Sequence, residues 1–476
     1  MSSLHTKKSL LIFGSQFLSL GLRFFSNIVL AWLLVPADFG VAAIVFTIIT
    51  GASLFSDVGI SDAVIRNKDG DDPDFLKTAQ ILLFFRGVIL YLAVFLLAPY
   101  AEQFFAIKDL TQYLRIAALN LLVLGFESVR IMQLTRHLKV LPGVAIELIA
   151  QLLTAVVVIA LAFYYRNVWP LVFSIVISAC IAVLLGQLYK PSRLSFKKIN
   201  RTYAKEILSF GIWILMSTVF SFFIMNADRL VLVKLSDTTN TGLFHLAVMF
   251  AGVVFLVSQK LIFSVLFPVV SSSVREGKEG PDIDLEMEQI LKGFLPILLV
   301  GSLAIFFGAR LLFGYLYADG YQGAIKMTQY LVPVFWLMMI YVIGNRVIIS
   351  KNRPGLAASF SAMCAMTRIL ACILGYQILG VAGFILGLGV GSMLGILLQQ
   401  FWMRTYMQLR FNYLISRTLV LFSVLGIYSL IENYFHSHTL MVYMFSIGLV
   451  AIFSSIYLWS NYAHKFKTAI QHRNMS

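Results

Sequence analysis

The sequence predicts an all-α polytopic membrane protein with about fourteen transmembrane helices and both termini in the cytoplasm. Hydrophobic residues make up 59% of the 476 residues and charged residues only 12%, and the mean hydropathy is +0.87. A water-soluble domain carries roughly one quarter charged residues and could not bury this much apolar surface. Apolar stretches of about twenty residues also recur between short polar breaks, which is the length that crosses a bilayer as a helix.

Each predicted span is one of these apolar stretches. The first is too long for a signal peptide and lacks a small-residue cleavage site, so we expect it to be a retained helix. In chain order the predicted spans are 9–35, 39–60, 78–100, 114–134, 143–165, 168–189, 207–226, 242–268, 290–309, 327–349, 355–376, 380–403, 418–432 and 440–460.

The distribution of basic residues sets the orientation. Most of the 37 lysines and arginines fall in the connections that are cytoplasmic if the N-terminus is inside, as the positive-inside rule requires. An odd number of spans would destroy this asymmetry, and twelve is the nearest alternative to fourteen. The predicted outer connections contain only Lys108, Arg166, Arg229, Lys234, Arg310 and Lys326.

A basic segment, Lys190–Lys205, divides the chain after the sixth span, and it is either a helix on anionic lipid or an ordinary inner loop. The halves on either side are weakly alike: FGVAAIVF from Phe39 resembles GLFHLAVMF from Gly242. Such internal symmetry is typical of transporters built from two repeated bundles. We therefore predict two pseudo-symmetric six-helix lobes and two C-terminal helices, with the divisions 1–190, 191–206, 207–404 and 405–476.

Several function classes are disfavoured. The net charge of +15 has no basic groove or soluble module to carry it, so no nucleic-acid partner is expected. The histidines lack metal-ligand spacing, and no phosphate-binding GxxxxGK[ST] loop is present, so we expect no metal and no cofactor. The predicted outer loops are too short for a catalytic domain, and we do not expect an enzyme. The cysteines, all in apolar segments, are interpreted as packing residues: Cys180, Cys364 and Cys372.

Polar residues inside the spans are the candidate functional residues, because a charge at a helix centre costs about 2.5 to 3.5 kcal/mol and needs a partner or a wet cavity. Arg23 lies near the middle of the first span, and polar residues recur around it at helical spacing. We predict that this face lines a central cavity; the alternative is a structural ion pair. The stripe consists of Ser15, Gln16, Ser19, Arg23, Ser26 and Asn27.

Arg86 and Arg368 also lie deep in their spans, and with Arg23 they are candidate ligands of an anion, because the arginine fork binds phosphate oxygens in pairs. Ser19 and Asn27 complete the predicted binding residues. A basic cavity implies an anionic passenger such as a diphosphate-linked lipid.

The acidic residues in the spans leave alternatives open. Asp57 and Glu147 either couple transport to a proton or sodium gradient or balance charge. Glu127 and Arg130 are three residues apart, so we predict that they neutralise each other.

Small residues repeat every four positions on the twelfth predicted span, and we interpret them as a close helix-packing face. They are Gly383, Gly387, Gly391 and Gly395.

The chain resembles the Wzx-like oligosaccharide (polysaccharide) flippases of the multidrug, oligosaccharidyl-lipid and polysaccharide exporter superfamily. The resemblance rests on segments in a characteristic order at the ends of spans. They are FSDVGISDAVIRNK from Phe55, LTRHLKV from Leu134, NADRLVLVKL from Asn226, SVLFPVVSS from Ser264 and GNRVIISKNRPG from Gly344.

The resemblance implies two six-helix lobes around a V-shaped cavity, two further helices, and alternating-access transfer of undecaprenyl-diphosphate-linked sugar repeats across a bacterial inner membrane. It implies a lipid-linked oligosaccharide substrate, contact with membrane lipids, and polymerase and glycosyltransferase partners. The alternatives are cation-coupled multidrug efflux, which predicts an acidic cavity, a membrane polysaccharide polymerase, and a membrane scaffold.

Overall fold

The computed structural model describes residues 2–55, 60–137, 139–192, 200–278, 280–351, 353–407, 409 and 412–435, and every regular element in these ranges is a helix. Eight of these helices are long and apolar enough to cross a membrane, and shorter apolar helices accompany them. Many large apolar side chains, such as Leu96, Ile297 and Val300, are more than 60% exposed, as lipid-facing positions must be. The predicted class, a multi-pass all-α membrane protein, is confirmed, whereas the number of spans and the side of the termini stay predictions.

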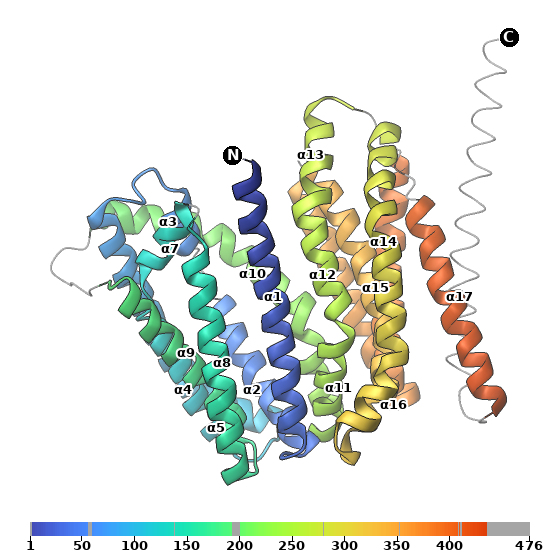
Figure 1. Ribbon diagram of the computed structural model, residues 1–476, viewed down its shortest axis with the longest axis horizontal. Coiled ribbons are helices and arrows are strands. Elements are labelled where there is room, and N and C mark those ends of the chain that lie inside the picture. Colours follow the sequence, from blue (N-terminus) through green and yellow to red (C-terminus); the bar gives the residue numbers. More distant parts are fainter. Residues whose placement is uncertain are drawn as a thin grey trace. The chain divides into compact units, whose positions relative to one another are not determined.

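The chain divides into two compact units, Met1–Leu246 with Phe313–Gly323, and Ala247–Leu312 with Ala324–Ser476. In the first unit α8 packs on α1 and α9, α4 packs on α5 and α6, and α10 packs on α2 (Figure 1). Its helices are α1 (Ser2–Ala31), α2 (Pro36–Leu54), α3 (Ile60–Arg66), α4 (Pro73–Phe105), α5 (Leu110–Ala117), α6 (Leu119–Leu124), α7 (Val129–Arg136), α8 (Leu141–Tyr165), α9 (Trp169–Tyr189), α10 (Arg201–Leu235), the first part of α11 (Thr238–Ala251), and η3 (Asp319–Tyr321).

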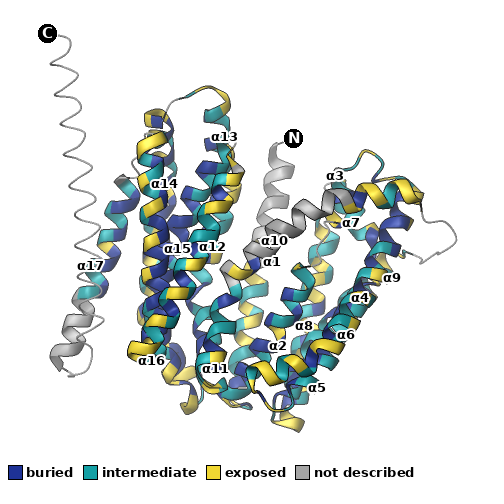
Figure 2. Ribbon diagram, turned by 180° about the vertical axis from the view of Figure 1, so that it is seen from behind, coloured by how far each residue is buried: buried dark blue, intermediate teal, exposed yellow. Residues whose placement is uncertain are grey.

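In the second unit α15 is the core helix, because 67% of its apolar window is buried, against 17% for α8 in the first unit. Figure 2 shows α15 largely in the colour of buried residues. The remaining helices of this unit include the π-helical turn η1, which lies between α12 and α13. They are α12 (Val253–Leu261), η1 (Ile262–Leu266), α13 (Phe267–Arg275), α14 (Gly280–Leu311), α15 (Gly323–Ser350), α16 (Pro354–Met407) and α17 (Asn412–Phe435), while η2 (Leu312–Leu316) spans the boundary between the units.

The predicted fourth span, 114–134, is wrong as a single helix, since the structure has α5, α6 and α7 with a non-helical break before Ser128. The buried Gln80 of α4 forms hydrogen bonds with the backbone groups at this break. Its Nε2 donates to the Glu127 carbonyl at 2.9 Å, and its Oε1 accepts from the Val129 amide at 3.2 Å. Non-helical backbone is tolerated at membrane depth only where the protein supplies such partners.

The α16 element contains two arms that meet at Leu379 and Gly380, where Gly380 has a φ of +59°. This bend separates the two predicted spans 355–376 and 380–403. The arms pack so closely that a Cβ added to Gly383 would lie 2.0 Å from the Gly375 carbonyl oxygen. Glycines further along the second arm meet residues further back along the first arm, so the two arms form an antiparallel hairpin. The predicted packing role of the glycines is confirmed. The pairs are Gly383 with Gly375, Gly387 with Ala371, Gly391 with Arg368 and Gly395 with Cys364.

A reciprocal contact joins α2 and α11 in the first unit. A Cβ on Gly40 would lie 1.8 Å from the Thr238 carbonyl oxygen, and one on Gly242 would lie 1.8 Å from the Pro36 carbonyl oxygen. Each glycine thus meets the residue four positions before the other. This local two-fold relation agrees with the repeat seen between the segments that start at Phe39 and Gly242.

The segment Phe313–Gly323 lies against the end of α1 although it is far away in sequence. The Tyr321 hydroxyl donates to the Leu34 carbonyl at 2.7 Å, and the Trp32 indole donates to the Leu316 carbonyl at 2.9 Å. Tyr321 also packs edge-on against Phe39, with ring centroids 5.9 Å apart. These contacts place this late segment in the first unit.

The predicted linker 191–206 is only partly described, because residues 193–199 lie outside the described ranges, as does the predicted span 440–460. α10 already begins at Arg201, where the Asn200 side chain accepts from the Thr202 amide at 3.0 Å. The Tyr203 hydroxyl then donates to Asp72 at 3.1 Å, which fixes the start of α10 to the start of α4. The predicted domain divisions stay predictions.

Candidate functional site

The polar stripe of α1 meets α8. The Ser19 hydroxyl donates to Gln151 Oε1 at 2.6 Å, and Gln151 Nε2 donates back to the Ser19 carbonyl at 2.8 Å. Two turns further along α1, Asn27 donates to the Arg23 carbonyl at 2.8 Å, and the Arg23 side chain is exposed. The stripe is therefore partly a helix-packing interface and partly an open polar surface that carries a cation.

Glu147 lies one turn before Gln151 on α8 and is exposed. Its position places a carboxylate on the helix that holds Ser19. Asp57, the other predicted coupling residue, lies outside the described residues. The coupling role of both residues stays a prediction.

Arg86 of α4 is fixed against α2. Its Nη2 donates to the Ser53 carbonyl at 2.6 Å and lies 3.5 Å from the Ser53 hydroxyl. Among the described residues, no ion pair joins the Glu127 carboxylate to Arg130. The predicted Glu127–Arg130 pair is therefore wrong, because the chain turns at residues 125–128 and breaks the helical spacing that the pairing assumed. The Arg130 side chain is exposed.

Arg368 belongs to the second unit and is buried, with 6% exposure, in the first arm of α16. Its backbone packs on Gly391. Arg23 and Arg86 both belong to the first unit. Ligation of one anion by all three arginines stays a prediction.

A half-buried cluster that the sequence analysis did not select lies in the last third of α10. Arg229 donates through Nη1 to Asn226 Oδ1 at 3.3 Å, and its backbone amide donates to Asp228 Oδ1 at 2.8 Å. His245 lies on α11. The Arg229 Nε and the His245 Nδ1 are buried and have no hydrogen-bond partner among the described residues. We assigned Arg229 to an outer connection, so its charge was not counted as buried.

Two of the segments that carry the family resemblance meet, and a third contacts the residue just before a fourth. In the first unit Arg136, from LTRHLKV, donates to the carbonyls of Ile65 at 3.0 Å and Lys68 at 3.2 Å, in the segment from Phe55. In the second unit the Arg346 guanidinium, from the segment starting at Gly344, lies 3.9 Å from the ring centroid of Phe263, which precedes SVLFPVVSS. Phe263 lies in η1, and π-helical turns are frequent at functional sites.

The described residues contain no cluster of three or more His, Cys, Asp or Glu side chains that could hold a metal ion. Two arginines within the helices have carbonyl and amide neighbours: Arg86 contacts the Ser53 carbonyl, and Arg229 contacts the Asn226 amide oxygen. Such an arrangement suits phosphate oxygens and sugar hydroxyls.

Two curated relatives are transport and polysaccharide proteins. The chain is 22% identical over 317 residues to the succinoglycan biosynthesis transport protein ExoT of Rhizobium meliloti (strain 1021), which covers 65% of this chain and 63% of ExoT. It is 23% identical over 397 residues to the lipopolysaccharide biosynthesis protein WzxC of Escherichia coli (strain K12), which covers 81% of this chain and 77% of WzxC. The chain thus spans just under two thirds of the length of ExoT.

Solved structures show the same fold. The lipid II flippase MurJ in an inward closed conformation matches with a TM-score of 0.68 and 16% identity, covering 95% of this chain and 99% of MurJ. An inward-facing multidrug resistance MATE family transporter of the MOP superfamily matches with a TM-score of 0.59 and 13% identity, covering 80% of this chain and 94% of the transporter. At these identities the likeness concerns the fold alone.

The sequence profile of one family covers more than half of the chain. Its match runs from residue 29 to residue 326, which begins six residues after Arg23 and includes Arg86, the Arg136 contacts and the Arg229 cluster. The chain therefore belongs to the polysaccharide biosynthesis protein family that this profile describes.

Proposed function

We propose that the protein is a flippase that moves undecaprenyl-diphosphate-linked oligosaccharide repeat units from the cytoplasmic to the outer leaflet of the bacterial inner membrane. The product would serve surface polysaccharide synthesis, as exopolysaccharide, capsule or O-antigen. One observation carries the proposal: α1, a predicted membrane helix, exposes Arg23 on a polar face just before the family match begins. The transport function named for ExoT and the fold shared with the lipid II flippase support it.

In this mechanism the diphosphate binds Arg23, with Arg86 and Arg368 assisting, while Ser19 and Asn27 contact the sugars. The arginines recognise the negative charge that every such substrate shares, and the hydroxyl and amide groups tolerate different sugars. The prenyl tail stays in lipid. Alternating access then exposes the bound head group to the other side.

Reconstituted vesicles with a labelled lipid-linked oligosaccharide test the proposal. We expect Arg23→Ala to lower the flipping rate roughly ten- to hundredfold, because a hydrogen bond to a charged group contributes about 1.5 to 3 kcal/mol. Arg310→Ala is the matched control, since Arg310 is exposed at the end of α14. Flipping by Arg23→Ala at the wild-type rate would refute the arginine assignment.

Cation-coupled drug efflux is the second candidate, favoured by the fold shared with a multidrug resistance transporter. It requires an acidic binding site for cationic drugs. Arg23 of α1 and Arg86 of α4 are cations instead, so we expect expression of the protein to leave drug resistance unchanged. Increased resistance together with absent lipid flipping would favour efflux.

The proposed activity is transport without catalysis by this chain. A proton or sodium gradient would drive it, with Glu147 and Asp57 as the candidate coupling residues and no other cofactor. Glycosyltransferases would supply the lipid-linked saccharide, and a polysaccharide polymerase would consume it. Collapse of each gradient in turn in the vesicle assay distinguishes the two ions.

A further inference from the structure

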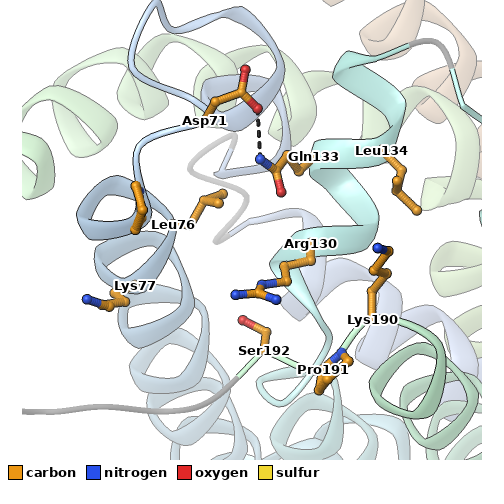
Figure 3. A pocket seen from close by; sticks show the side chains of 10 residues that line it. Asp71, Leu76, Lys77, Arg130, Gln133, Leu134, Lys190, Pro191 and Ser192 are labelled. Carbon is orange, nitrogen blue, oxygen red and sulfur yellow. Dashed lines mark hydrogen bonds between the residues drawn. The ribbon is translucent and has the colours of Figure 1, made fainter.

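A cavity of about 820 Å³ lies in the first unit between the start of α4, α7 and the residues that follow α9 (Figure 3). The Arg130 side chain extends from α7 into the space between α7 and α4, and Lys190 stands beside it. Lys77 of α4 also lines the cavity, with the apolar Leu76 and Leu134. The lining thus combines cations with apolar surface.

The walls of this cavity are held by hydrogen bonds. The Ser128 hydroxyl at the start of α7 donates to the Lys190 carbonyl. Gln187 Nε2 donates to the Phe126 carbonyl at 2.6 Å, and the Ser192 amide donates to Gln187 Oε1 at 2.8 Å. The segment that carries Lys190 is therefore fixed to α7 rather than free to collapse into the cavity.

The nearby carboxylates already have partners. Asp71, which lines the cavity, accepts from Gln133 at 2.7 Å, from Arg136 at 3.0 Å and from His137 at 2.8 Å. Lys77 forms an ion pair with Asp74 at 2.9 Å. No ion pair joins Arg130 or Lys190 to any carboxylate in the part of the chain that the structure describes. These two side chains supply the uncompensated positive charge of the cavity.

We propose that this cavity binds the phosphate diester head group of an anionic phospholipid from the cytoplasmic leaflet. The Arg130 fork and the Lys190 ammonium would hold the phosphate, while Leu76 and Leu134 contact the glycerol and the first acyl carbons. Lys77, Arg130 and Lys190 fall in connections that the charge distribution places in the cytoplasm or at the ends of spans beside it. Basic pockets between helices on this side are suited to lipid head groups, and roughly 300 to 1,000 Å³ is the usual volume of a ligand site. The site is separate from the residues assigned to flipping.

Native mass spectrometry of the full-length protein in detergent tests this binding, with phosphatidylglycerol and phosphatidylcholine as competing probes. We expect the wild type to retain phosphatidylglycerol in preference to phosphatidylcholine. The double variant Arg130→Gln with Lys190→Gln should bind phosphatidylglycerol roughly thirtyfold more weakly, about fivefold for each cation. Lys139→Gln is the matched control, because Lys139 is exposed between α7 and α8 and does not line the cavity.

Two further arms separate the sources of phosphate. Undecaprenyl diphosphate and inorganic diphosphate are added to the phosphatidylglycerol complex of the wild type. Retention of phosphatidylglycerol against both supports the phospholipid site. The proposal is overturned if either one displaces phosphatidylglycerol at equal concentration, if the double variant binds like the wild type, or if Lys139→Gln loses as much binding. Equal melting temperatures of the variants exclude misfolding as the cause.

Discussion

At the scale of the residue, Arg136 shows how one side chain determines local structure. Its guanidinium reaches the carbonyls at the end of α3 and the turn after it, and a Cβ on Gly70 would lie 2.7 Å from its Nη1. Asp71 completes the arrangement by accepting from Arg136. The sequence showed Arg136 only as one more cytoplasmic cation, because its partners are carbonyl groups that every residue possesses.

Asp71 makes stability depend on pH. Hydrogen bonds from Gln133, His137 and Arg136 lower the pKa of the Asp71 carboxyl to about 2, so the folded state favours the charged form. This contribution is fully present above the unfolded value of about pH 4 and is lost as the pH falls toward 2. We expect Asp71→Asn to melt below the wild type at neutral pH, with a difference that narrows below about pH 4.

Thermal unfolding in detergent across this pH range measures that difference. Asp282→Asn, at an exposed carboxylate in the first turn of α14, controls for the loss of one negative charge. A difference that widens on acidification would contradict the assigned role of Asp71.

At the scale of the element, sequence reasoning succeeded where the signal lies within one segment. The glycines of α16 repeat every four residues and meet the facing arm at each repeat, as predicted. It failed at α5 to α7, because the hydropathy is continuous there and the break depends on Gln80 from another helix. Likewise, nothing local in the sequence indicates that the Arg229 Nε is buried.

The hairpin of α16 gives a direct test of close packing. A Cβ on Gly387 would lie 2.2 Å from the Ala371 carbonyl oxygen, which the backbone cannot yield without separating the arms. We expect Gly387→Ala to destabilise the protein by roughly 1 to 3 kcal/mol, the usual cost of overpacking.

Gly355 provides the control on the same element, since a Cβ there meets nothing within 4 Å. Gly355→Ala should leave the melting temperature unchanged or raise it slightly, because alanine favours helix. Equal melting temperatures for the two variants would contradict the packing role of Gly387.

At the scale of the whole molecule, the class of the fold followed from composition and from the length of the apolar stretches. The first of the two units extends to Leu246, and α10, which follows the basic linker, packs on α2, α3 and α4 of that unit. Substrate chemistry was predicted from the sign of the charges in the spans, whereas the identity of their partners required the fold. The predicted orientation of the chain in the membrane can be tested by a topology experiment.

Accessibility of single cysteines measures that orientation. In a variant without Cys180, Cys364 and Cys372, we expect Lys108→Cys to react with a membrane-impermeant maleimide in right-side-out vesicles. Lys139→Cys should react only after permeabilisation, because the charge distribution places it inside. Both positions are exposed, so a difference in reactivity reports the side of the membrane. Reaction of Lys139→Cys in sealed vesicles would contradict the predicted orientation.

The attachment of Phe313–Gly323 to the first unit has a consequence for biosynthesis. Domains generally fold as units while the chain emerges from the ribosome, N-terminal part first. Tyr321 and Leu316 are the hydrogen-bond partners of Leu34 and Trp32. The ribosome synthesises them only after α12, α13 and α14 of the second unit. The first unit therefore cannot complete its folding until residues 313–323 have been synthesised, by which time part of the second unit is already present.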